Sequence, residues 1–226
     1  MTSRGRAGGP SAVIFDMDGV LVDSEVIAIE VEVAALAAVG VSLTPAELAA
    51  RYVGTSAVAM RGMVVEEFGV DLDDAFWARL EADSHAALAE RLVAVPGMRA
   101  VVEGLAVPCA VASSSSHARI ALSLRTAGLA DLFEVGARFS AEDVERGKPA
   151  PDLFLHAAAA LGVEAPACGV VEDSPFGVQA ARAAGMDVIG FTGGGHADEA
   201  WAARLGAAGA AVVAADAASL GAMLAG

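Results

Sequence analysis

The stretch AVIFDMDG at residues 12–19 decides the fold of this chain. Four apolar residues lead directly into two carboxylates, Asp16 and Asp18. A short continuous apolar run of this kind predicts a strand that is buried on both faces of a sheet. A capping aspartate in a polar loop is the alternative interpretation. However, an unpaired carboxylate beside a buried strand is costly, so Asp16 is expected to have a cationic partner or a metal.

Downstream of this stretch, strand and helix signals alternate at the spacing of βα units. This alternation predicts a Rossmann-like α/β fold, a parallel sheet with helices on both faces. Strands are expected at 107–112, 132–135, 168–171, 187–191 and 210–213. Helices are expected at 116–127, 151–161, 174–184 and 197–205 and after Asp216.

The first two strands are unusually far apart. Asp16 and Ser113 end these strands about 100 residues apart, whereas one βαβ unit needs only about 30. The surplus is helical by pattern, with caps at Ser24 and Thr44. We therefore expect a small all-helical cap domain at 24–95, inserted into a core domain formed by 1–23 and 96–226.

Composition excludes several classes of protein. The chain has 226 residues, of which 56% are hydrophobic, so it has the length and apolar content for a packed core. Its formal net charge of -15 argues against nucleic acid and anionic membranes as partners. Two cysteines do not make a disulfide scaffold, and the first ten residues lack the apolar run of a secretory signal. We expect a cytoplasmic protein.

Further polar residues follow the other strands, at the sheet edge where ligands bind in such folds. The serines at 113–116 are either a helix cap or, with backbone N–H groups, an anion site. Glu172 and Asp173 are either part of a cap or a second acidic pair for a hard cation such as Mg²⁺. The four histidines show no metal-ligand spacing.

Lys148 stands out because of the composition. The chain contains 13 arginines and this single lysine, so arginine serves wherever a generic positive charge is needed. A surface lysine is the plainer interpretation. A compact ammonium, however, can neutralise a carboxylate and a phosphoryl group together in a tight site, which an arginine does less well. The composition favours a specific role for Lys148.

In order along the chain, these pieces resemble the haloacid dehalogenase-like superfamily of hydrolases. The matching segments are 16–25, Ser113, 147–149 and 172–174, within a span from Ala12 to about Phe191. The helical insert resembles the cap of the β-phosphoglucomutase-like branch. The resemblance implies a Mg²⁺-dependent hydrolase that acts on the phosphomonoester of a small phosphorylated metabolite.

The resemblance also implies a role for each residue. Asp16 would form an aspartyl phosphate, and Asp18 would act as general acid and then general base. Ser113, Ser114 and Lys148 would hold the phosphoryl group. Asp16, Asp18 through its backbone carbonyl, Glu172 and Asp173 would hold Mg²⁺.

Departures from the family pattern narrow the activity. The haloacid dehalogenases lack the second carboxylate of the first motif, which is Asp18 in this chain. The phosphonatases use a lysine in the cap, whereas the single lysine here, Lys148, lies outside the cap. Ala28 and Ala57 occupy positions where the mutases have histidine and arginine. We therefore expect a phosphatase, and we expect its substrate to be a sugar phosphate or a sugar-acid phosphate. A phosphosugar mutase, a phospho-receiver domain and a non-catalytic binding protein are the alternatives.

Substrate selection is expected in the cap, because a closed cap contacts the leaving group. Glu25, Arg51, Arg79 and His85 are candidate contacts there. Taken singly, each is better explained as part of a solvated helix face, so none is assigned to the site.

Overall fold

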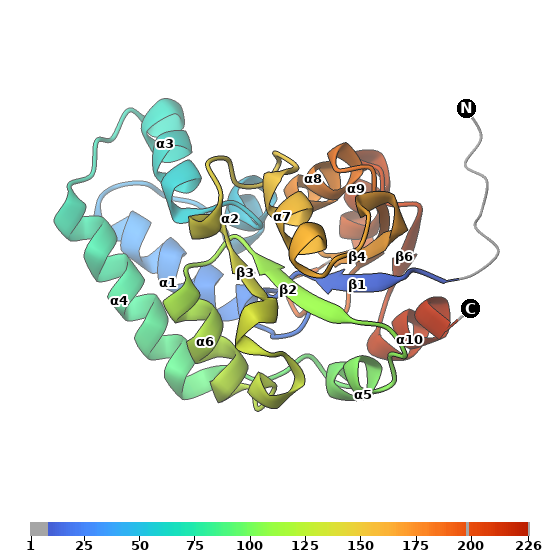
Figure 1. Cartoon of the computed structure of the whole chain (residues 1–226). Helices are drawn as coiled ribbons and strands as arrows, with labels where there is room; N and C mark the ends of the chain where they lie inside the picture. Colours follow the sequence, from blue (N-terminus) through green and yellow to red (C-terminus); the bar gives the residue numbers. More distant parts are fainter. Residues whose placement is uncertain (1–8, 198, 226) are drawn as a thin grey trace.

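Six strands form one parallel sheet in the order β3-β2-β1-β4-β5-β6 (Figure 1). This computed structural model describes residues 9–197 and 199–225. The strands are β1 (Ala12–Phe15), β2 (Cys109–Ser113), β3 (Arg138–Ser140), β4 (Cys168–Glu172), β5 (Asp187–Phe191) and β6 (Val212–Ala214). The expected parallel α/β sheet is confirmed.

The strand β1 is central and contributes to two cores. Ala12 and Ile14 point into one hydrophobic core, and Val13 and Phe15 point into the other. All four are fully buried, because the alternating side chains of a strand meet helices on both faces of a covered sheet.

Helices cover both faces of the sheet (Figure 1). One face carries α7 (Asp152–Ala160), α8 (Pro175–Ala183) and α9 (Glu199–Ala208). The other carries α5 (Met98–Glu103), α6 (His117–Thr126) and α10 (Ala217–Ala225). The short 3₁₀ helices are η1 (Ala130–Leu132), η2 (Val135–Ala137), η3 (Ala141–Asp143) and η4 (Ala165–Ala167).

Helices follow β1 in the chain. They are α1 (Glu25–Ala38), α2 (Pro45–Tyr52), α3 (Ala57–Phe68) and α4 (Asp74–Arg91), together called the insert. The start of α2 is well defined, because Thr44 and Glu47 form a reciprocal capping box and Pro45 occupies the first turn. The insert lies at the end of the sheet opposite α10 (Figure 1).

The predicted strand at 132–135 is wrong. This region forms η1 and η2, and the third strand is Arg138–Ser140, which pairs with β2. The apolar signal at 132–135 comes from Phe133, which is buried because its ring packs edge-on against Phe15 at 6.4 Å. Its burial therefore reflects tertiary packing of a turn and not a strand period.

The strand order places a switch point between β1 and β4. Chain connections leave these neighbours toward opposite edges of the sheet, so their carboxyl ends open a crevice. Asp16 directly follows β1, and Asp173 directly follows β4. Within the described residues, no helix has the length and apolar character needed to span a membrane.

Two leucines of α7 test the two-core packing. Leu153 is fully buried against the sheet, whereas Leu155 is 42% exposed on the same helix. We expect Leu153→Ala to lower the free energy of unfolding by about 2–5 kcal/mol, because it removes buried methyl groups and leaves a cavity. Leu155→Ala, the matched control, is expected to change it by less than about 1 kcal/mol. Urea unfolding measures both, and equal losses would contradict this packing.

Candidate active site

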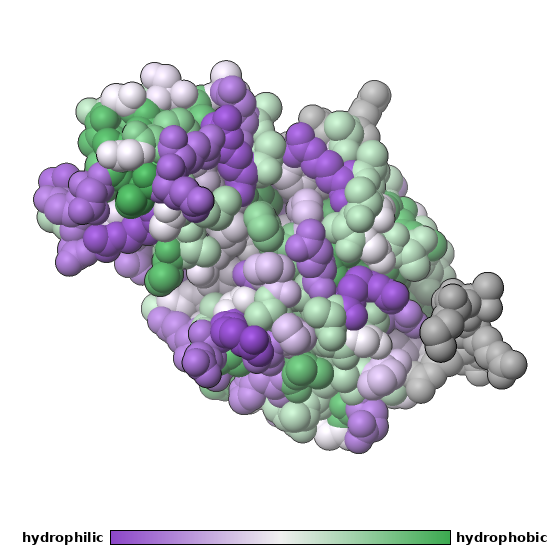
Figure 2. Space-filling model, turned by 90° about the horizontal axis from the view of Figure 1, so that it is seen from above, coloured by the Kyte–Doolittle hydropathy of each residue, from purple (hydrophilic) through white to green (hydrophobic). Residues whose placement is uncertain are grey.

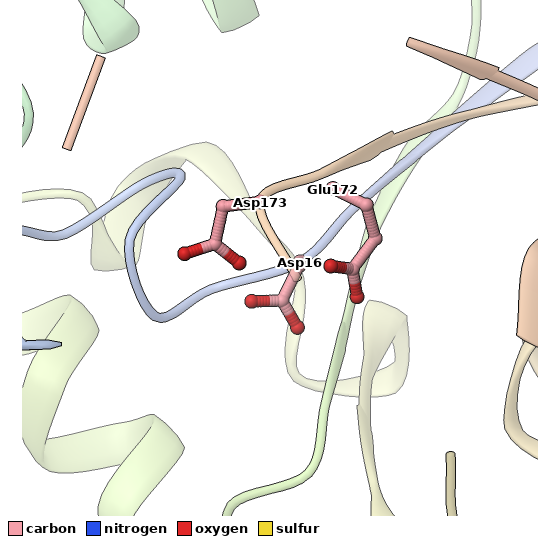
Figure 3. A group of neighbouring side chains, drawn as sticks. All are labelled: Asp16, Glu172 and Asp173. Carbon is pink, nitrogen blue, oxygen red and sulfur yellow. The ribbon is translucent and has the colours of Figure 1, made fainter. Parts of the chain in front are cut away.

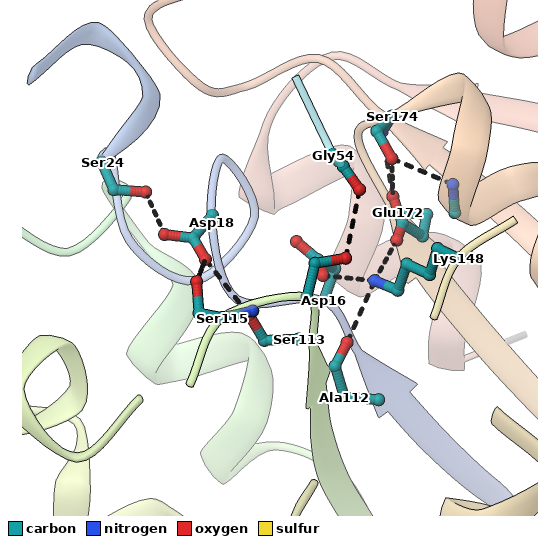
Figure 4. A network of polar contacts seen from close by, with 12 residues as sticks. Asp16, Asp18, Ser24, Gly54, Ala112, Ser113, Ser115, Lys148, Glu172 and Ser174 are labelled. Carbon is teal, nitrogen blue, oxygen red and sulfur yellow. Dashed lines mark hydrogen bonds and ion pairs between the residues drawn. The ribbon is translucent and has the colours of Figure 1, made fainter. Parts of the chain in front are cut away.

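The polar residues singled out from the sequence come together at the carboxyl ends of β1, β2 and β4 (Figure 4). Ser113 and Glu172 are the last residues of β2 and β4, and Asp16 and Asp173 directly follow β1 and β4. Lys148 reaches them from the loop before α7. All five side chains are buried, so their charges can interact with little screening by solvent.

Lys148 is held between two carboxylates. Its Nζ donates to Asp16 Oδ1 and to Glu172 Oε1, both at 2.5 Å. A third bond goes to the carbonyl of Ala112 at 3.0 Å, and the ring of Phe154 lies 5.0 Å from Nζ. Although burial opposes it, the charges of Asp16 and Glu172 raise the pKa of Lys148. The ammonium is therefore fixed in place and remains charged.

Three carboxylates, of Asp16, Glu172 and Asp173, converge within 4.8 Å of one another (Figure 3). Burial raises the pKa of Asp16 to about 8, against the lowering effect of Lys148, and it raises the pKa of Asp173 well above its usual value. One ammonium does not balance three carboxylates. This surplus of buried oxygen ligands suits a hard divalent cation.

Asp173 has an oxygen available for such an ion. Its Oδ2 is buried and accepts no hydrogen bond. His196 Nε2 lies 3.2 Å from this oxygen, without hydrogen-bond geometry. The backbone carbonyl of Asp173 accepts a bond from Trp201 Nε1 at 2.6 Å, and the indole ring packs edge-on against His196. These contacts fix the position of Asp173 while leaving Oδ2 unpartnered.

Two glycines leave room for the carboxylates. Gly19 has a φ of +75°, and any side chain there would collide with Asp173 Oδ2. A side chain at Gly177, in the first turn of α8, would collide with the Glu172 carboxylate. A side chain at either position would therefore displace the carboxylate that it meets.

Asp18 lies apart from the acidic cluster, with its carboxylate held by its own set of donors. Oδ1 accepts from Ser24 Oγ at 2.6 Å and from an Arg119 guanidinium nitrogen at 3.1 Å. Oδ2 accepts from Ser115 Oγ at 2.9 Å and Ser113 Oγ at 3.2 Å. Although burial opposes it, Arg119 and the hydroxyl groups lower the pKa of Asp18. The pKa of Asp16 is thus raised, whereas that of Asp18, two residues away, is lowered.

Three of the Asp18 partners were missed from the sequence. Ser24 precedes α1 as expected, but its side chain makes no cap bond because it points to Asp18. In the sequence, nothing distinguishes Ser115 from the other serines at 113–116. Arg119 lies in the first turn of α6, where basic residues are unfavourable next to the positive helix end. That placement was the available signal of a nearby carboxylate.

The serines at 113–116 bond to several parts of the molecule, and Ser113 and Ser115 share Asp18 as a partner. Ser113 Oγ donates to Asp18 and accepts from the backbone N–H of Ser115 at 3.0 Å. Ser114 Oγ donates to the carbonyl of Gly54 in the insert at 3.1 Å. Ser116 is the residue that caps α6, through the N–H of Arg119. One polar run therefore joins the sheet, the helix and the insert.

A cavity of about 920 Å³ lies between these groups and the insert. Figure 2 shows the molecule hollowed beside the lobe that contains α3, with hydrophilic side chains at the rim. Of the four candidate cap contacts, Glu25 and His85 line the cavity, whereas Arg51 and Arg79 are not among its lining residues. Volume of this order accommodates a small metabolite.

Two glutamates of α1 face the cavity next to Asp18. Glu25 and Glu32 both line the cavity, and the charge of Arg119 acts to lower the pKa of both carboxyl groups. Burial and the Asp18 charge raise the pKa of Glu25 well above its usual value. Burial raises the pKa of Glu32 to about 7. This side of the cavity is short of positive charge.

The geometry agrees with comparison to known proteins. The family model described as haloacid dehalogenase-like hydrolase matches residues 13–191. The chain belongs to the haloacid dehalogenase-like hydrolase family. The resemblance drawn from the four sequence segments is thereby confirmed, as is the fold expected with it.

Similar proteins cover most of the chain. A 6-phosphogluconate phosphatase of Escherichia coli is 34% identical over 82% of this chain and 84% of that protein. Hexitol phosphatase A of the same organism is 35% identical over 78% and 80%. A conserved haloacid dehalogenase-like protein of Agrobacterium tumefaciens has a TM-score of 0.84 and 37% identity, covering 96% of this chain and 98% of its own.

The raised pKa of Glu32 predicts that replacing this residue with a neutral one stabilises the protein at high pH. A raised pKa means that the favourable contribution of the protonated carboxyl is present below about 4.5 and is lost as pH rises through about 7. We expect Glu32→Gln to stabilise the protein by about 1–3 kcal/mol at pH 8, with the gain shrinking toward pH 5.

Urea unfolding across this pH range measures the effect. Glu30→Gln is the control on the same helix, because Glu30 forms an exposed ion pair with Arg91 and its loss is expected to cost less than about 1 kcal/mol. A Glu32→Gln protein that is no more stable than wild type at pH 8 would contradict the assignment.

Proposed function

We propose that this chain is a Mg²⁺-dependent phosphomonoester hydrolase that acts in the cytoplasm on a small phosphorylated metabolite. The observation that carries the proposal is the Lys148 ammonium, which bridges Asp16 and Glu172 at the floor of the cavity. A fixed cation beside a buried carboxylate can bring that carboxylate and an anionic phosphoryl group together.

In this proposal Asp16 attacks the phosphorus atom and forms an aspartyl phosphate. Asp18, two residues away, protonates the leaving oxygen and then takes a proton from the water that hydrolyses the intermediate. Ser24, Ser115 and Arg119 hold the Asp18 carboxylate through hydrogen bonds. These donors fix its orientation between its two roles as acid and base.

The phosphoryl group would be held by Ser113, the backbone N–H of Ser114 and Lys148. Ser113 lies at the end of β2 beside Asp18, and Lys148 contacts Asp16. Phosphoryl transfer of this kind depends mainly on positioning and on neutralising charge, which these donors can supply.

The buried acidic cluster fits a magnesium ion. Asp16, Asp173 and the backbone carbonyl of Asp18 would hold it directly. Glu172 would act through water, because its oxygens already accept bonds from Lys148 and Ser174. When bound, the ion would shield the repulsion between the attacking carboxylate and the phosphate.

The substrate class proposed is a sugar phosphate or sugar-acid phosphate. The printed names of two similar proteins, a 6-phosphogluconate phosphatase and a hexitol phosphatase, support this class. A mutase is disfavoured because Ala28 and Ala57 line the cavity at the positions where mutases have histidine and arginine. Neither alanine can bind or transfer a proton.

Phosphate release from a panel of phosphorylated metabolites tests the proposal. We expect turnover that requires Mg²⁺ and that Asp16→Asn abolishes, because an amide cannot act as the nucleophile. Asp187→Asn is the matched control, since this exposed aspartate opens β5 away from the acidic cluster. Undiminished phosphate release by Asp16→Asn would refute the mechanism.

The ammonium of Lys148 is expected to be irreplaceable. Its Nζ is enclosed by Asp16, Glu172, a backbone carbonyl and the Phe154 ring, which leaves no room for a planar guanidinium. We expect Lys148→Arg to lower kcat by about 100-fold or more, a loss typical of a displaced charge-stabilising donor. Arg146→Lys, in the same loop and exposed, is the control. Near-normal kcat for Lys148→Arg would overturn this role.

A further inference from the structure

Two glutamates of α1 give one wall of the cavity an excess of carboxyl groups, and the leaving group of the substrate must occupy the space beside them. Glu25 and Glu32 lie on one face of α1, about two helical turns apart, with Ala28 between them. All three residues line the cavity. No described residue donates a hydrogen bond to either glutamate or forms an ion pair with it. Two acceptors therefore face the space that the leaving group must occupy.

The arginines and the lysine that line the cavity are already engaged. Arg119 donates to Asp18 at 3.1 Å through one nitrogen, its charge also acts on the two glutamates, and its Nε is buried without a hydrogen-bond partner. Arg61 pairs with Asp74 at 2.6 Å, and Lys148 is held at the acidic cluster. Only the imidazole of His85 remains among the basic side chains lining the described cavity. A carboxylate on the leaving group would meet only arginine and lysine side chains that already have a carboxylate partner.

We infer that Glu25 and Glu32 select phosphate esters whose leaving group carries hydroxyl or ammonium groups and no negative charge. The inference rests on the proposed function and narrows its substrate class to polyol, sugar or amino-sugar phosphates, with sugar-acid phosphates rejected. Hydroxyl and ammonium groups donate to the two glutamates, whereas a third carboxylate meets like charge in a partly buried space.

The burial of the two glutamates supports this selection. Burial raises the pKa of both glutamates, and the charge of Asp18 adds to the effect at Glu25. A hydrogen-bond donor from the substrate stabilises the ionised form of each glutamate, whereas an added carboxylate destabilises it. The same cavity therefore favours one end-group and disfavours the other without a change of shape.

A matched pair of substrates tests the inference. Glucitol 6-phosphate and 6-phosphogluconate differ only at C1, which is a hydroxymethyl group in one and a carboxylate in the other. We expect wild-type kcat/KM to favour glucitol 6-phosphate by at least about tenfold, since like-charge contacts at a binding site cost several kcal/mol. We expect Glu25→Gln and Glu32→Gln to reduce this ratio by raising kcat/KM for 6-phosphogluconate.

Glu30→Gln on the exposed face of α1 is the matched control and should leave the ratio unchanged. A wild-type preference for 6-phosphogluconate, or a ratio that neither cavity variant alters, would overturn the inference while leaving the phosphatase proposal intact.

Binding of the same two compounds to Asp16→Asn with Mg²⁺, measured by calorimetry, separates selection from turnover. Preferential binding of glucitol 6-phosphate supports the inference even if no substrate is hydrolysed, an outcome that would refute the proposed function alone. Equal binding, tighter binding of 6-phosphogluconate, or no binding of either compound would overturn the inference.

Discussion

The bridge from Lys148 to Asp16 and Glu172 is the interaction on which the rest of the site depends. Without it, three carboxylates would be buried within a few ångströms of one another and the cost of ionising them would be prohibitive. The ammonium makes the cluster possible but does not neutralise it. The remaining negative charge suits a cation, whereas Arg119 and the hydroxyl groups around Asp18 stabilise the second aspartate in its ionised form.

Much of this arrangement could be predicted from the sequence, because parallel sheets obey strong rules. A buried apolar run followed by Asp16, together with polar residues after later strands, implies convergence at one edge once the strands are known to be parallel. Lys148 was identifiable from composition alone, as the single lysine among thirteen arginines. The glycines that make room for Asp173 and Glu172 could not be interpreted in this way, since their role depends on contacts across the crevice.

Other features depend on tertiary contacts that leave a weak trace in the sequence. The segment 132–135 has a strand-like composition because Phe133 packs under the sheet, and the true strand at β3 opens with a charged residue, Arg138. Ser24 has the sequence position of a helix cap, yet its hydroxyl serves a carboxylate six residues earlier. The surroundings of Asp18 show why cap signals and site signals are hard to separate: both use small hydroxyl side chains at the starts of helices.

The position of β1 in the sheet has a consequence for how the protein is made. This strand leaves the ribosome first, but its two neighbours, β2 and β4, are synthesised much later, and Lys148 is 132 residues from Asp16. Contacts so distant along the chain form slowly, because long loops must close before any contact rewards them. A nascent chain that stops before β4 lacks both a complete sheet and a balanced acidic cluster. The same late part of the chain therefore completes both the sheet and the acidic cluster.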